Sequence, residues 1–142
     1  MFSKEESKKI RQEFWIFFGK RFPKKWLLYN TGIKDVVLKF SFDTKKALVS
    51  FDSCSPDPIL RTYYFEKFES LKLLLKEEVS SNLIFDGNYE LESGKIVSRV
   101  YLQKDNVSIH NKQSWPEVFE FFNNNMTAMQ DFFLEYEEII KA

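Results

Sequence analysis

The sequence predicts a single α+β domain over residues 1–142, with a mostly antiparallel sheet of four to six strands packed against three helices. Three observations support this fold class. Short segments of alternating apolar and polar residues occur in pairs around turn residues, which is typical of β-hairpins. Three longer segments carry apolar residues at helical spacing. The chain also has 16 Phe, 6 Tyr and 3 Trp, enough large side chains for one substantial core.

The expected order of elements is α-β-β-α-β-β-α, beginning with a helix over Lys4–Gly19. Ser3 and Glu6 have the spacing of a capping box at its start. Its apolar stripe consists of Ile10, Phe14, Phe17 and Phe18. A connection over residues 20–35 follows, in which residues 26–29 are expected to form a short strand.

Two hairpins account for most of the predicted sheet. The first pairs residues 36–42 with residues 47–52 across a turn, and the second pairs residues 83–92, with an irregularity at Gly87, with residues 95–103. A further short edge strand is expected at residues 107–110. Consecutive hairpins favour an antiparallel sheet with the helices on one face.

Two further helices are expected. One spans Pro58–Glu78, with Asp57 as its N-cap. Its apolar face consists of Leu60, Tyr64, Phe68, Leu71 and Leu75. The other begins at a capping box formed by Ser114 and Glu117. Its apolar residues repeat at alternating steps of four and three, a heptad-like seam of Trp115, Phe119, Phe122, Met126, Met129, Phe133, Tyr136 and Ile140.

That seam has two interpretations. A face this wide favours packing against the sheet of the same chain. The alternative is a structural homodimer formed through the Trp115–Ile140 helix, because a long helix can extend past a small sheet.

The side chains that most cofactor and zinc sites need are scarce. With one cysteine, Cys54, and one histidine, His110, neither an intrachain disulfide nor a zinc site built on nitrogen and sulfur is expected. The glycines do not have the spacing of a phosphate-binding or dinucleotide-binding loop. No cofactor and no metal site are therefore expected, although the plentiful carboxylates leave a Mg²⁺ site as an alternative. The N-terminus lacks the apolar region of a signal peptide, and no apolar run is long enough for a bilayer, so we expect a cytoplasmic protein.

Three short patterns in the sequence are similar to parts of catalytic sites. Ser108 lies two residues from His110, but adjacency in sequence is not the geometry of a triad. Cys54 precedes a helix, where a thiol pKa can be lowered, but a small semi-buried residue is the favoured interpretation. Asp35 followed by Asp43-Thr44-Lys45 matches the short pattern of a Mg²⁺-dependent restriction-type nuclease, which stays an alternative function.

Charge is unevenly distributed although the net charge is zero. Residues 1–46 hold 12 Lys/Arg against 5 Asp/Glu, and the remainder of the chain is correspondingly acidic. Such asymmetry indicates either contact between the two parts or a charged partner, such as nucleic acid or an acidic protein.

Basic and aromatic residues are interleaved in the connection after the first helix, as in sites that hold phosphates and stack bases. The candidate binding residues are Lys20, Arg21, Lys24, Lys25 and Trp26, together with Arg99 from the second hairpin. We therefore expect a non-catalytic binding or interaction module associated with nucleic acid, the alternative being a basic loop that is merely solvated.

Several short motifs occur in the order typical of one known family. They are Phe14-Trp15, Phe18-Gly19, Trp26–Asp35, Tyr64–Lys67, Ser98–Tyr101, Val107–Ile109 and Trp115-Pro116. With these motifs the chain resembles a bacterial family, seen chiefly in Bacteroidetes-type bacteria, that is known as domain of unknown function 4268. The resemblance covers nearly the whole chain and implies a stand-alone domain. Relatives carry it behind nuclease-like or other modules, which implies a nucleic-acid context, but the family supplies no catalytic residues.

Overall fold

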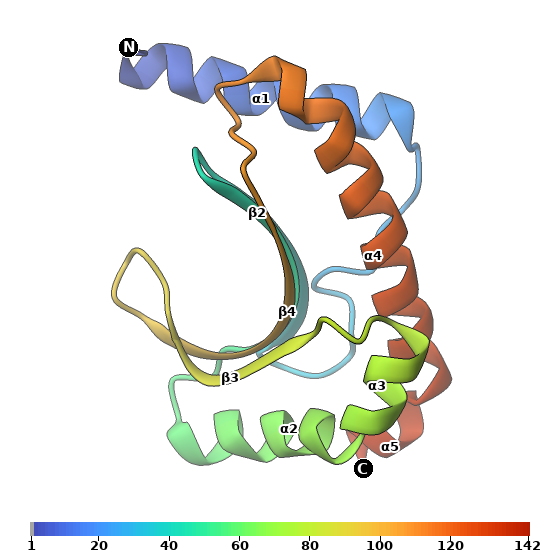
Figure 1. Cartoon of the computed structure of the whole chain (residues 1–142). Helices are drawn as coiled ribbons and strands as arrows, with labels where there is room; N and C mark the ends of the chain where they lie inside the picture. The colour runs from blue at the N-terminus through green and yellow to red at the C-terminus, as the bar shows by residue number, and fades with distance from the viewer. Residues whose placement is uncertain (1) are drawn as a thin grey trace.

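The computed structural model describes residues 2–142, and within them four antiparallel strands form one sheet in the order β1-β2-β4-β3 (Figure 1). The strands are β1 (Val36–Phe42), β2 (Lys46–Ser53), β3 (Ile84–Glu90) and β4 (Ile96–Asp105). The α-helices are α1 (Lys4–Arg21), α2 (Pro58–Ser70), α3 (Lys72–Glu78), α4 (Trp115–Glu135) and α5 (Glu137–Lys141), with a 3₁₀ turn η1 (Lys112–Ser114) before α4. The α+β class and the antiparallel sheet are therefore confirmed.

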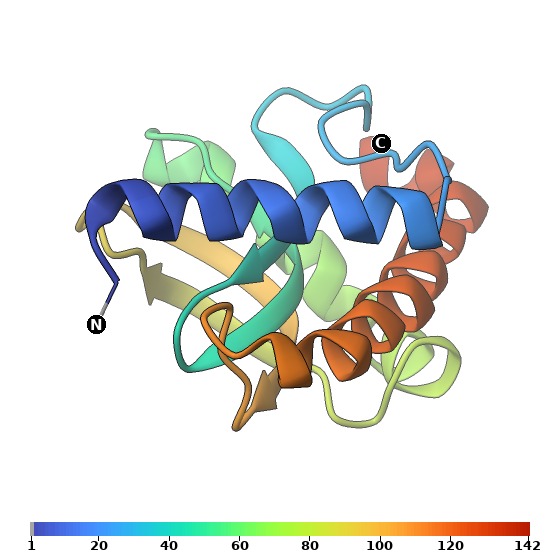
Figure 2. The same ribbon diagram turned by 90° about the horizontal axis from the view of Figure 1, so that it is seen from above.

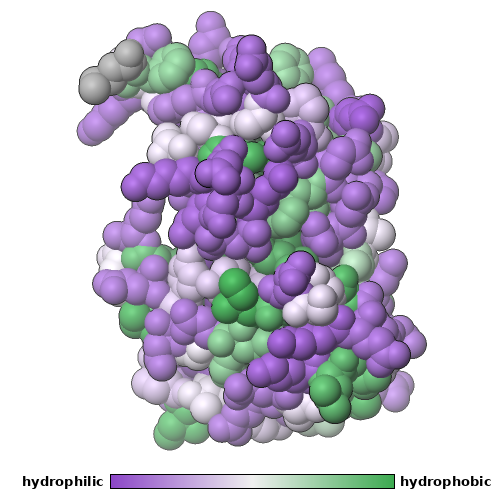
Figure 3. All heavy atoms as spheres, viewed as in Figure 1, coloured by the Kyte–Doolittle hydropathy of each residue, from purple (hydrophilic) through white to green (hydrophobic). Residues whose placement is uncertain are grey.

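The sheet is strongly curved, and the helices cover only its convex face. Figure 1 shows α4 running along the convex side, with α1 beyond one end of the sheet and α2 beyond the other. Seen from above, α1 lies across the sheet and its C-terminal end approaches α4 (Figure 2). The concave side carries no helix, and hydrophilic residues predominate along it (Figure 3). A curved sheet with helices on one side only is a feature that the pattern of alternating hairpins does not reveal.

The core lies between the convex face and the helices. Phe14 of α1 is fully buried and lies edge-on to Phe42, Trp115 and Phe122, with ring centroids 4.8, 5.3 and 5.9 Å away. At the other end of the sheet, Phe51 stacks on Phe68 at 4.8 Å. Aromatic pairs of this kind stabilise by about 0.5–1.5 kcal/mol beyond the area that they bury.

Two of the three predicted helix starts are confirmed at the level of single hydrogen bonds. Ser3 and Glu6 form the capping box, with each side chain accepting from the other residue's backbone N–H. The Asp57 carboxylate accepts from the Ile59 N–H at 2.9 Å. The third prediction is wrong: Ser114 makes no capping bond to α4, because its backbone is already helical and its hydroxyl lies 2.7 Å from the Asn111 carbonyl oxygen.

The prediction of three helices is wrong in number, because two of them break. Leu71 separates α2 from α3, and Tyr136 separates α4 from α5. After each break, a short helix packs against a long helix from the other half of the chain. The short helix α3 packs on α4, and the short helix α5 packs on α2. The order is thus α-β-β-α-α-β-β-α-α rather than α-β-β-α-β-β-α.

The predicted apolar face of the second helix is also partly wrong. Leu60 is 49% exposed, and Phe65 takes its place in the core beside Phe68. At about 100° per residue, Leu60 lies about 80° from Phe68 around the helix axis, and Phe65 lies about 60° from Phe68 in the opposite direction. Leu60 and Phe65 are therefore on different sides of the helix.

Two predicted short strands do not form. Residues 26–29 contain Leu28 at φ 45°, which is outside the extended region, and the segment instead passes beside the edge of β1. Residues 107–110 form turns, and the Ile109 N–H donates to the Asp43 carbonyl at 2.9 Å. The irregularity at Gly87 is confirmed as a shift in the β3–β4 register between Asp86 and Tyr89.

The heptad-like seam of the last helix is used within the chain. Trp115, Phe122, Met126, Met129 and Phe133 are all buried against the sheet and the other helices. These side chains are therefore not available to a second copy of the chain. The homodimer through this helix stays a prediction, but these buried residues cannot supply its interface. Over residues 2–142, the structure contains no helix with both the length and the apolar character that crossing a membrane requires.

Candidate functional site

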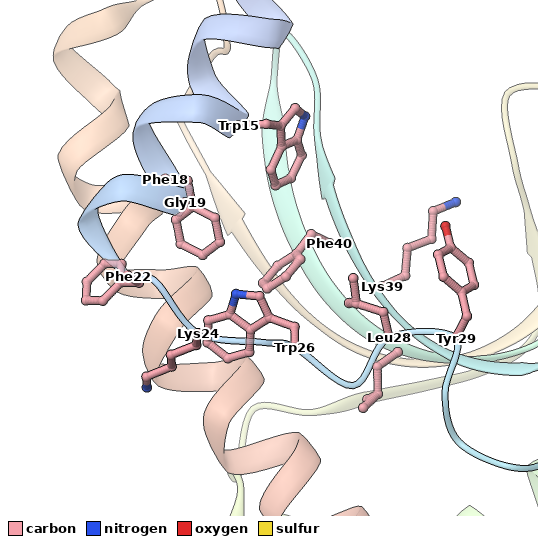
Figure 4. A pocket seen from close by; sticks show the side chains of 11 residues that line it. Trp15, Phe18, Gly19, Phe22, Lys24, Trp26, Leu28, Tyr29, Lys39 and Phe40 are labelled. Atoms are coloured by element: carbon pink, nitrogen blue, oxygen red, sulfur yellow. The ribbon is translucent and has the colours of Figure 1, made fainter.

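A groove opens where the end of α1, the connection after it and the edge strand β1 meet (Figure 4). It has a volume of about 350 Å³. Its lining residues are Trp15, Phe18, Gly19, Phe22, Lys24, Trp26, Leu28, Tyr29, Leu38, Lys39 and Phe40. We call it the aromatic groove.

Aromatic rings form the middle of the aromatic groove. Trp26 lies parallel to Phe18, with centroids 6.1 Å apart and planes 7° from parallel, and it meets Phe40 edge-on at 5.5 Å. Phe18 is buried and Trp26 is half-buried, so the inner rings are fixed by the core. Trp15 and Tyr29 are 38% and 76% exposed, so they offer ring surface to a ligand.

Two lysines lie at the two ends of the aromatic groove, with the rings between them (Figure 4). The ammonium nitrogen of Lys24 lies 5.3 Å from the centroid of Trp26 and donates to the hydroxyl of Thr127 at 3.2 Å. Lys39 projects from β1 beside Tyr29. No aspartate or glutamate lines the aromatic groove, so its lining carries only positive charge.

Specific backbone bonds hold the connection against the sheet. The Leu38 N–H of β1 donates to the Leu28 carbonyl at 3.0 Å, and the Leu27 N–H donates to the Gln130 side chain of α4 at 3.1 Å. The left-handed backbone of Leu28 turns the chain between these two bonds. The groove is therefore built from a loop that is tied to both the sheet and α4.

The structure brings together only part of the predicted basic-aromatic set. Lys24 and Trp26 line the aromatic groove, whereas Lys20 and Lys25 are exposed beside it and do not line it. Arg21 pairs with Glu120 of α4 at 2.8 Å, as expected if the basic N-terminal part packs on acidic later elements.

Arg99 is wrongly grouped with this set. It lies on β4, facing the concave side of the sheet, where Asp52 binds it in a buried ion pair. Sequence reasoning instead missed Trp15, Tyr29 and Lys39. The alternating pattern of β1 does indicate that Lys39 lies on the polar side of its strand. Its position beside Tyr29, however, depends on the path of the connection between α1 and β1.

The residues of the nuclease pattern do not converge. Asp35 and Asp43 flank opposite ends of the seven-residue β1, so they are separated by roughly 26 Å of extended chain at about 3.3 Å per residue. Asp43 accepts from the Lys45 and Lys46 N–H groups at 2.7 and 2.9 Å, so it closes the β1–β2 turn. Among the described residues, no cluster of three or more His, Cys, Asp or Glu could hold a metal ion.

The two nucleophilic patterns also lack the required geometry. The Nε2 atom of His110 lies 3.1 Å from the hydroxyl of Ser7 on α1, while the Ser108 hydroxyl accepts from the His110 backbone. The Cys54 thiol donates to the Asp35 carbonyl at 3.2 Å, and burial raises its pKa above the ordinary value. A raised pKa disfavours the reactive thiolate, so Cys54 is a structural residue.

Comparison with known proteins identifies a family and nothing closer. The sequence model of a family described as "Domain of unknown function (DUF4268)" matches residues 10–137. No curated protein matches the chain, and no solved structure matches it.

Proposed function

The chain belongs to the DUF4268 family, whose description assigns no function, and we propose from the aromatic groove that this protein is a non-catalytic module that binds single-stranded nucleic acid. The observation that carries the proposal is a groove that combines accessible aromatic rings with lysines at both ends and lacks any lining carboxylate. Proteins that bind single strands without sequence preference combine these same two features, stacking rings and a positive path for the backbone.

The arrangement of the groove suits a short stretch of strand. Tyr29 and Trp15 are the exposed rings on which bases would stack, and stacking on one aromatic side chain contributes about 1–3 kcal/mol per base. Lys24 and Lys39 would neutralise phosphates at the two ends of the same stretch. The exposed Lys20 and Lys25 add positive charge outside the groove, which would speed association.

An acidic protein segment is the competing partner, because it too would be attracted by lysines. It would not need the ring faces, so the exposed aromatic residues favour nucleic acid. Loss of binding on removing a ring, while every charge is kept, separates the two partners.

The test is fluorescence anisotropy of labelled oligothymidylate and oligouridylate with the full chain over a series of salt concentrations. Binding is expected at low salt, with an affinity that falls linearly on logarithmic axes by about 0.7 per neutralised phosphate. Tyr29→Ala should weaken binding by about 1–3 kcal/mol, and Tyr29→Phe should retain it, because only the ring is needed. Tyr29 is 76% exposed, so neither variant should alter folding.

Charge variants complete the design. Lys24→Gln should lower the salt slope by about 0.7. Lys45→Gln removes the same charge from the exposed β1–β2 turn, outside the lining of the aromatic groove, and should leave both slope and affinity unchanged. Absence of binding to either oligonucleotide at low salt would refute the proposal, and so would equal losses in Lys24→Gln and Lys45→Gln.

A further inference from the structure

The concave face of the sheet holds a second hollow of about 440 Å³, separate in its chemistry from the aromatic groove. We call it the trough. Its charged and aromatic lining consists of Lys39, Phe42, Asp43, Lys46, Tyr89, Glu90, Glu92 and Arg99. Lys39 is the one residue that it shares with the aromatic groove. A hollow of this size lies within the usual range for small-molecule sites.

The floor of the trough is a fixed guanidinium. Arg99 donates through Nε and Nη2 to the two carboxylate oxygens of Asp52, both at 2.8 Å, and each side chain is 3% exposed. Tyr89 lies over the guanidinium, with its centroid 4.3 Å from Cζ. These contacts fix the guanidinium in one orientation.

A polar group beside the floor lacks a partner. Ser50 is fully buried, and its hydroxyl makes no hydrogen bond to any described residue. It lies on the concave side of β2, in register between Lys39 of β1 and Tyr101 of β4. A buried hydroxyl without a partner costs about 1–3 kcal/mol. Ser50 does not line the trough itself, but it continues the row of polar groups on this side of the sheet, which apolar packing alone does not require.

The walls of the trough carry opposite charges. Lys39 and Lys46 project from β1 and β2, whereas the carboxylates are Asp43 in the β1–β2 turn and Glu90 and Glu92 at the β3 end of the second hairpin. Among the described residues, none of these lysines forms an ion pair with either glutamate within 4.0 Å. Opposite charges therefore face one hollow without neutralising each other directly.

We propose that the trough binds a small zwitterion of the amino-acid class, with its carboxylate toward Arg99 and Lys46 and its ammonium group toward Glu90 and Glu92. A ligand carrying both charges complements both walls at once. A simple anion, such as a phosphate, would meet the two glutamates unfavourably, and a simple cation would meet Arg99 and the lysines. This ligand goes beyond nucleic-acid binding, which depends on different residues.

The first experiment measures thermal unfolding of the full chain with each of the twenty standard L-amino acids at millimolar concentration. At least one is expected to raise the unfolding temperature, because a ligand that binds only the folded state stabilises it. For that amino acid, the N-acetyl derivative and the methyl ester each lose one charge. Each should bind about tenfold or more weakly, the effect of losing one charge-assisted hydrogen bond.

The second experiment locates the site. The Arg99 Nε–H resonance should shift on titration with the stabilising amino acid, a readout that requires no substitution at the buried pair. Lys46→Gln and Glu90→Gln should each weaken binding about tenfold. Their controls, Lys45→Gln in the exposed turn and Glu69→Gln on α2, remove the same charges outside the trough and should leave binding unchanged.

Three results would overturn the proposal: no amino acid raises the unfolding temperature, the acetylated or esterified form binds as well as the parent, or the trough variants bind like their controls. None of these results affects oligonucleotide binding by the aromatic groove, because Lys46 and Glu90 do not line it.

Discussion

The buried ion pair between Arg99 and Asp52 provides the sharpest test of how the concave face is built. Each side chain is only 3% exposed, and two bonds of 2.8 Å join them. Burial alone would lower the pKa of Arg99, but the hydrogen bonds and the charge of Asp52 raise it on balance, so the guanidinium stays charged. Asp52→Asn removes the compensating charge and leaves a positive group buried beneath Tyr89.

Removing one partner of a buried pair destabilises a protein by about 3–5 kcal/mol. Asparagine keeps one acceptor oxygen, so we expect about 3 kcal/mol for Asp52→Asn, which is the lower end of that range. In a chain of 142 residues this corresponds to a fall of roughly 10 °C in the unfolding temperature. The double variant Asp52→Leu with Arg99→Met, which removes both charges, should be about as stable as the wild type.

The assay is urea unfolding followed by tryptophan fluorescence, because the three tryptophans lie in α1, the connection and α4, away from the pair. A lower midpoint with an unchanged slope would show lost stability rather than a changed unfolded state. A loss below about 1 kcal/mol, the range of exposed pairs, would refute the reasoning. It would mean that water reaches the guanidinium and that the floor of the trough is not fixed.

Three further predictions concern the core, a helix cap and the C-terminal break. Phe14→Ala should cost about 3–5 kcal/mol in urea unfolding, because the ring is fully buried among other aromatic rings. Asp57→Ala should cost about 1 kcal/mol in the same assay by removing the bond to the Ile59 N–H. The hydrogen bond to Glu78 raises the pKa of Tyr136 from 10.0 to about 12. The bond therefore contributes its full stability below pH 10 and loses it as the pH rises through 12. Tyr136→Phe should abolish that loss of stability at high pH. In an absorbance titration of the tyrosines, the variant should lack the phenolate that forms at the highest pH.

Local patterns predicted the elements but not the way they bend. Ser3 with Glu6 and Asp57 with Ile59 act within a few residues of one another, so spacing alone identifies them. The breaks at Leu71 and Tyr136 have no such local cause, because they turn α3 onto α4 and α5 onto α2. A capping pattern can also mislead, since Ser114 has the expected spacing but its hydroxyl lies close to the Asn111 carbonyl within the preceding turn.

The candidate site shows the same limit. Interleaved charge and rings identified Lys24 and Trp26, which lie within three residues of each other and share the aromatic groove. Arg99 was selected for its charge alone, and its true partner is Asp52 on the adjacent strand, which only the register of β2 and β4 reveals. Trp15 and Lys39 were missed because an edge strand and a helix that are separated in sequence bring them together.

The one-sided cover of the sheet links these features. Because none of the described helices lies on the concave face, the residues that alternate inward on β2 and β4 face no helix, and polar groups such as Ser50, Asp52 and Arg99 are found on that side. Curvature then reduces their exposure, and the Tyr89 ring lies over the guanidinium, so the ion pair loses contact with water. Replacing such a pair with well-packed apolar residues is often neutral or stabilising. Stability alone therefore does not require a fixed guanidinium on the concave side, which supports the ligand site proposed there.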